Sequence, residues 1–147
     1  MTYTVARFLC LLFLTSTILA GDKDSPIYAV VHKTLSMTAR SCMVSANASE
    51  VDLEPLREDP PFPEKSACIL NCLLEKINIV KSGKFSKSGF MTTISPLVFT
   101  NKKKMDHMKT VSENCDKEVN HDVSSCELAN EITSCIYKYA PELHFKN

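Results

Sequence analysis

The sequence predicts an all-helical domain held together by disulfide bonds. Three observations favour this fold class: apolar residues recur at spacings of three and four, the alternation typical of strands is weak, and cysteines are numerous. The chain has 147 residues and seven cysteines, far more cysteines than a cytosolic protein of this size usually carries. We therefore expect one small domain that folds in an oxidising compartment.

The N-terminus predicts export. Arg7 precedes an apolar run that begins at Phe8 and ends at Ala20, and small residues at Ala20 and Gly21 suit cleavage. This run is shorter than the roughly 20 apolar residues that a membrane span needs. We expect a signal peptide over residues 1–20 and a secreted, extracellular domain over residues 21–147. Cys10 would be removed with the signal peptide, which leaves six cysteines, an even number that can pair completely.

The charge balance argues against nucleic acid as a partner. The chain carries 17 basic and 17 acidic side chains, so it lacks the basic excess that DNA-binding and RNA-binding proteins normally show. No second apolar segment is long enough to span a bilayer, so no integral membrane segment is expected after cleavage.

The helices are expected in five or six short pieces. Ser25 and Pro26 predict a first helix near residues 26–43, and residues 51–57 permit a short helix that Pro55 interrupts. Prolines at 60, 61 and 63 predict an extended connection, after which a helix runs from Glu64 to near residue 81, before Gly83. Further helical stripes cover residues 105–119 and 126–139, and Pro141 ends the last one.

One region is less regular. Gly83 and Gly89 bracket a lysine-rich turn, and residues 90–99 then form an apolar patch in which Pro96 either kinks or begins a helix.

The cysteine spacing restricts the disulfide pattern. Cys68 and Cys72 lie one turn apart on one helix face, so they cannot bridge without distortion. Cys126 and Cys135 lie about 13 Å apart along one helix, which prevents their pairing. Ten of the 15 possible pairings remain. A zinc site is the competing interpretation, but these spacings lack the tight pairs it needs, and no metal is expected.

The gaps between the six cysteines are 25, 3, 42, 10 and 8 residues. This spacing resembles insect odorant-binding proteins of the pheromone-binding and general odorant-binding family, six-cysteine type. The distinctive parts are the three-residue gap after Cys68 and the eight-residue gap after Cys126. Supporting residues are Glu75, Lys76, Gly83, Ala129, Pro141 and Glu142.

The resemblance implies a compact six-helix odorant-binding fold around an apolar cavity. It also implies three interlocked disulfides, Cys42–Cys72, Cys68–Cys126 and Cys115–Cys135. The implied function is a carrier that binds a small hydrophobic ligand of the odorant or pheromone class and transports it through aqueous fluid without chemical change or cofactor. The lysine-rich turn from Lys81 to Lys87 and Pro96 depart from the family pattern and put the fourth helix in doubt.

The candidate cavity wall is apolar and adaptable. Met105 and Met108 lie one turn apart beside Val111, and the flexible thioether suits ligands of several shapes. Met108 and Phe99 are expected to line the cavity next to the least regular part of the chain. Ordinary core packing explains each residue equally well when it is taken alone. The ligand-lining candidates are Leu74, Ile77, Phe90, Val98, Phe99, Met105, Met108, Val111, Ile132, Ile136 and Phe145.

The tail beyond Pro141 is a candidate lid. Leu143 and Phe145 offer apolar groups that could close a cavity mouth, and His144 between them would gain charge between about pH 7 and 5. Acid is therefore expected to loosen the tail. A disordered terminus is the alternative.

Two further features are expected at the surface. Asn47, Ala48 and Ser49 form an N-glycosylation sequon just past the first helix. The Lys102–Lys104 run could touch an anionic membrane, although a solvated helix start is the ordinary explanation.

No enzyme is expected. The four histidines are scattered without a metalloprotease or hydrolase motif, and six paired cysteines leave no thiol nucleophile. The rival class is a secreted non-olfactory carrier or protein-interaction modulator of seminal, salivary or haemolymph type with the same fold. The expected partners are a small hydrophobic ligand and, as a further candidate, a membrane receptor. We expect a monomer or a weak homodimer.

Overall fold

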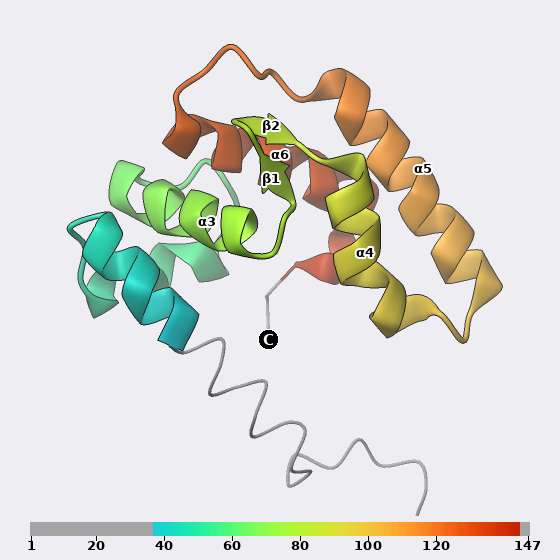
Figure 1. Cartoon of the computed structure of the whole chain (residues 1–147), viewed down its shortest axis with the longest axis horizontal. Coiled ribbons are helices and arrows are strands. Elements are labelled where there is room, and N and C mark those ends of the chain that lie inside the picture. The colour runs from blue at the N-terminus through green and yellow to red at the C-terminus, as the bar shows by residue number, and fades with distance from the viewer. Residues whose placement is uncertain (1–36, 145–147) are drawn as a thin grey trace, which may run out of the picture. The chain divides into compact units, whose positions relative to one another are not determined.

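The computed structural model describes residues 37–144, which are mostly helical (Figure 1). Residues 37–45 form the end of the first expected helix. The beginning of that helix, the expected signal peptide with Cys10, and Phe145 lie outside the described residues. The elements that follow are η1 (Glu50–Arg57), α3 (Glu64–Lys76), β1 (Val80–Lys81), β2 (Lys84–Phe85), α4 (Lys87–Val98), α5 (Lys102–Glu118), α6 (Ser125–Tyr139) and η2 (Pro141–Leu143).

Most of the expected helices are confirmed. The helix expected over residues 105–119 is α5, and the helix expected over residues 126–139 is α6. Their N-caps are Asn101 and Ser124, whose side-chain oxygens accept the backbone N–H of Lys104 and Glu127. Residues 50–57 form a 3-10 helix that contains Pro55, and an irregular connection follows it.

The expected end of α3 is wrong by about one turn, because the helix stops at Lys76 rather than near residue 81. Asn78 takes a positive φ of 62°, a conformation that asparagine tolerates better than most residues. Its N–H donates to the Glu75 carbonyl at 3.0 Å, and the N–H of Ile79 donates to the Leu74 carbonyl at 2.9 Å. This pair of bonds is a Schellman motif with asparagine in the place that glycine usually takes.

Sequence periodicity also missed a β-hairpin. Val80 pairs with Phe85 and Lys81 with Lys84, in antiparallel register. Ser82 and Gly83 between the strands have φ values of 52° and 70°, and two positive φ values are what a type I′ hairpin turn requires. Strands of two residues are too short to show alternation, so only the turn could have predicted them.

The doubtful fourth helix is regular for most of its length. Its N-cap is Ser86, whose Oγ accepts the N–H of Gly89 at 3.1 Å. Pro96 lies in the last turn, so the alternative in which Pro96 begins the helix is wrong. The C-cap, Phe99, follows immediately.

Three disulfides connect the helices in series. Cys42–Cys72 joins the 37–45 segment to α3, Cys68–Cys126 joins α3 to α6, and Cys115–Cys135 joins α5 to α6. These are the pairs that the cysteine resemblance implies. They close sequence separations of 30, 58 and 20 residues, and each restricts the unfolded chain by about 3–4 kcal/mol on the loop-entropy model.

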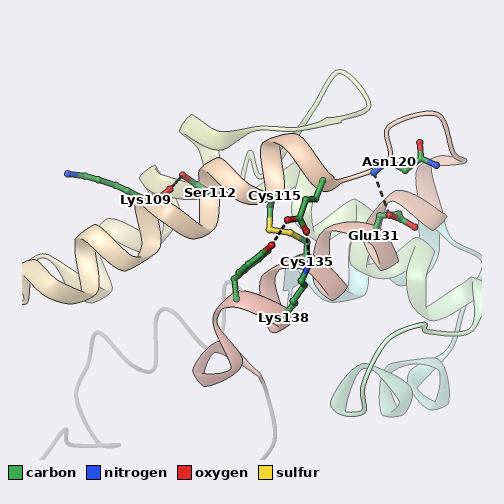
Figure 2. Close-up of a disulfide and its surroundings, with 9 residues drawn as sticks. Lys109, Ser112, Cys115, Asn120, Glu131, Cys135 and Lys138 are labelled. Atoms are coloured by element: carbon green, nitrogen blue, oxygen red, sulfur yellow. Dashed lines mark hydrogen bonds and ion pairs between the residues drawn. A yellow bond between two sulfur atoms is a disulfide. The ribbon is translucent and has the colours of Figure 1, made fainter.

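A polar cluster lies beside the third bridge. The carboxylate of Glu118 accepts a hydrogen bond from Nζ of Lys138 at 2.8 Å and another from the Tyr139 hydroxyl (Figure 2). These bonds, that of Lys138 first, hold the pKa of Glu118 below its usual value, and Glu118 in turn raises the pKa of Lys138. A lowered carboxyl pKa stabilises the fold above the unfolded pKa, and this contribution is lost as the pH falls through the folded pKa.

Gly89 provides a test of how α4 is attached to the preceding turn. A Cβ at position 89 would lie 1.7 Å from the backbone oxygen of Asn78, whereas a Cβ at Gly83 meets nothing within 4 Å. We expect Gly89→Ala to lower the free energy of unfolding by more than about 3 kcal/mol, because backbone must move. Gly83→Ala should lower the free energy of unfolding by only about 1–2 kcal/mol, the cost of a Cβ at positive φ. Urea titration measures both, and equal losses would contradict the close approach.

Candidate functional site

The candidate site is the apolar interior between α4, α5 and α6. Helix α4 packs against α5, and α5 packs against α6 (Figure 1). Seven of the ligand-lining candidates are buried together in this cluster, with side chains at most 8% exposed. They are Leu74, Phe90, Val98, Met108, Val111, Ile132 and Ile136. Met105 is partly buried and packs against the same cluster.

Two candidates lie outside this group. Phe99 is 73% exposed and Ile77 is 38% exposed. Both are the C-caps of their helices. Because successive residues of a helix point about 100° apart, the burial of Val98 turns Phe99 away from the interior. Phe145, the last candidate, cannot be placed because it lies outside the described residues.

The interior also includes residues that helical periodicity missed. Ile79, Val80 and Phe85 belong to the buried cluster and come from the α3–β1 turn and the hairpin. The rings of Phe85 and Phe90 lie 6.0 Å apart, which joins the hairpin to α4. The apolar residues around the Ser82–Gly83 turn were the available signal. The hairpin therefore contributes Val80 and Phe85 to the apolar core, while its turn from Lys81 to Lys84 is exposed.

One buried polar side chain has an incomplete set of hydrogen-bond partners. Asn71 is 7% exposed and lies on the same face of α3 as Leu74, which belongs to the buried cluster. Its Nδ2 donates to Glu75 Oε1 at 3.1 Å, which fixes the amide orientation because a carboxylate only accepts. Its Oδ1 is buried, and within residues 37–144 no donor reaches it. A buried acceptor of this kind is costly unless a donor meets it.

Over residues 37–144, no three histidine, cysteine or acidic side chains come close enough together to hold a metal ion. In the same part of the chain, no helix combines the length and the apolar character that crossing a bilayer would take.

The start of the tail is held by two histidine–carboxylate contacts. His144 Nε2 lies 2.5 Å from Asp59 Oδ1, and the His144 ring stacks on Tyr137 with centroids 4.3 Å apart. His107 Nε2 lies 3.5 Å from Glu142 Oε1. These contacts connect the segment after α6 to α5 and to the proline-rich connection. The expectation that acid loosens the tail stays a prediction.

The sequon residue is accessible. Asn47 is exposed in the turn after the 37–45 helix, as attachment of a glycan requires. Glycosylation of Asn47 stays a prediction.

The chain belongs to the PBP/GOBP family, which matches residues 27–139. This is a family of odorant-binding carrier proteins for small hydrophobic ligands, not of enzymes. The family match confirms the resemblance that the cysteine spacing indicates.

Two solved structures share the fold. Odorant-binding protein dmelOBP28a from Drosophila melanogaster has a TM-score of 0.62 and 21% identity, over 76% of this chain and 93% of its own. Odorant Binding Protein 4 from Chrysopa pallens has a TM-score of 0.56 and 24% identity, over 81% of this chain and 97% of its own. No curated protein sequence matches the chain. The expected all-helical odorant-binding fold is confirmed.

Met108 and Phe99 form a matched pair for testing which candidates belong to the interior. Met108 is 2% exposed, so Met108→Ala removes buried contacts and should lower the free energy of unfolding by about 2–5 kcal/mol. Phe99 is 73% exposed, so Phe99→Ala should change it by no more than about 0.5 kcal/mol. Chemical denaturation with the disulfides intact measures both. A larger loss for Phe99→Ala would place that ring in the core.

The tail contacts can be tested by removing their carboxylates. The double variant Asp59→Asn with Glu142→Gln should exchange the amides of residues 141–144 faster than the parent protein, because it loses the ion pairs with His144 and His107. Hydrogen exchange at one pH, corrected for the intrinsic rate, measures the difference. Equal exchange in the two proteins would show that these contacts do not hold the segment.

Proposed function

We propose that this chain is a secreted carrier that takes up one small hydrophobic molecule in the interior between α4, α5 and α6 and releases it unchanged. The observation that carries this proposal is the buried apolar cluster that these helices share within a PBP/GOBP fold. Apolar burial would supply most of the binding free energy, at about 25 cal/mol per Å² of apolar surface.

The wall suits ligands of varied shape. Met108 is buried in the cluster, and Met91 and Met105 pack against it as partly buried residues. Methionine side chains adjust to irregular shapes because they are unbranched and polarizable. The three methionines come from α4 and α5, so the adaptable part of the wall lies along one helix pair.

The buried oxygen of Asn71 adds a preference within this ligand class. A ligand hydroxyl that reached Asn71 Oδ1 would satisfy an acceptor that finds no donor among residues 37–144. We therefore propose long-chain alcohols over hydrocarbons of the same length.

A larger side chain in the interior distinguishes a carrier with room for a ligand from a protein whose core is already filled. Val111 is 1% exposed in α5, and Val111→Phe adds a ring to the interior. In a carrier the ring occupies ligand volume, so the affinity for a fluorescent apolar probe should fall at least roughly tenfold, a loss of about 1.4 kcal/mol, with stability nearly unchanged. Probe fluorescence titration and thermal unfolding measure the two quantities. The probe should be displaced better by an alcohol than by the matching hydrocarbon.

The control is Val51→Phe, because Val51 is 74% exposed on η1 and should change neither quantity. A closely packed interior gives the opposite pattern, in which Val111→Phe lowers stability by about 1–3 kcal/mol and the parent protein binds no probe. That outcome would favour the rival interpretation of a protein-interaction modulator with the same fold.

A further inference from the structure

The turn between α4 and α5 exposes two large apolar side chains. Leu97 is 75% exposed and Phe99 is 73% exposed, while Val98 between them is buried in the cluster. The turn lies at the end of the α4–α5 pair that is remote from the β-hairpin (Figure 1). Burial of Val98 thus holds Leu97 and Phe99 on the outside of the helix end.

Three lysines follow directly. Lys102, Lys103 and Lys104 are all exposed and occupy the first turn of α5. Within the described residues 37–144, the ion pairs include none of the three. The first turn of a helix carries a partial positive charge, so three cations there are electrostatically unfavourable for the helix itself. The fold does not account for these charges.

The sequence around the turn has one sign of charge. Between Glu75 and Asp106 there is no acidic residue, although the whole chain has a net charge of zero. Exposed lysines Lys76, Lys81 and Lys84 lie in the same stretch, at the end of α3 and in the hairpin. Residues 76–105 therefore carry seven positive charges that the rest of the chain balances, and Lys102, Lys103 and Lys104 place three of them next to the apolar tip.

We propose that the α4–α5 turn, defined as residues 97–104, is a docking surface for an anionic lipid bilayer. Leu97 and Phe99 enter the boundary between headgroups and acyl chains, and the lysine ammonium groups remain at the headgroup level on their flexible stems. Each lysine near an anionic surface strengthens binding about fivefold. The attachment is peripheral and reversible, and it does not depend on whether the interior binds a ligand.

The size of the surface favours a membrane over a protein partner. A stable protein interface buries about 800 Å² on each partner, which corresponds to about 20–30 residues. The α4–α5 turn offers two apolar side chains and a local positive charge, too little for such an interface. A bilayer accepts a small insertion and pairs with the charge through its anionic headgroups.

The absence of tryptophan from the chain allows a direct test. Phe99→Trp places a single fluorescent reporter at the tip, and Val51→Trp places one at an equally exposed control position, 74% exposed on η1. We expect the tryptophan emission maximum of Phe99→Trp to shift to shorter wavelength when vesicles of phosphatidylcholine and phosphatidylserine are added at low salt. No shift is expected with phosphatidylcholine alone, at high salt, or for Val51→Trp.

Charge-matched variants in the Phe99→Trp background test the lysines. Replacing Lys102, Lys103 and Lys104 with glutamine should weaken binding to the mixed vesicles roughly 100-fold. The control replaces Lys76, Lys81 and Lys84, which removes the same charge away from the tip and should weaken binding less than about tenfold. Circular dichroism checks that both variants fold.

Two results would contradict the proposed docking surface. If Phe99→Trp shows no shift with mixed vesicles, or if the two lysine variants lose binding equally, the docking surface is not at this turn. Probe binding in the interior is measured separately and would be unaffected by either result.

Discussion

The structure depends on the fact that α3 and α6 each carry two half-cystines that cannot pair with one another. Cys68 and Cys72 in α3, and Cys126 and Cys135 in α6, must each reach a different element, so the bridges link the 37–45 segment, α3, α6 and α5 in one covalent series. Hydrogen bonds between the Asn130 side chain and the backbone of Phe62 add a further tie between α6 and the proline-rich connection. Helices fixed in this way can enclose an interior that apolar packing alone would hold less firmly.

Helix α4 stands outside this covalent series because it contains no cysteine. It is held by Phe90, Ile94 and Val98 in the apolar cluster and by the close approach of Gly89 to Asn78. The least constrained wall of the candidate site is thus also the helix that ends at the exposed Leu97 and Phe99. Local opening is easiest in an element that no covalent bridge holds, so exchange of a ligand would involve α4 before the bridged helices.

Long periodic segments and cysteine spacing were the parts of the fold that the sequence could predict. The stripes of α5 and α6 are long enough to define a helical face, and the cysteine gaps identified the family and, through it, the disulfide pairs. The hairpin and the end of α3 could not be predicted in this way, because a Schellman motif on Asn78 and strands of two residues leave no periodic pattern. Among the site candidates, the sequence could not predict which apolar residue at the end of α4 points into the core. Phe99 and Val98 are adjacent and both apolar, and only their packing distinguishes them.

A native mass spectrum of protein purified from its source shows directly whether this interior holds a small hydrophobic molecule. We expect the mass of the chain without the proposed signal peptide and with its six cysteines oxidised, together with a noncovalent adduct of one small apolar molecule per chain. Dissociation in the gas phase should release that molecule chemically intact. A spectrum of the bare chain alone, unchanged after equilibration with long-chain alcohols and fatty acids, would contradict this expectation.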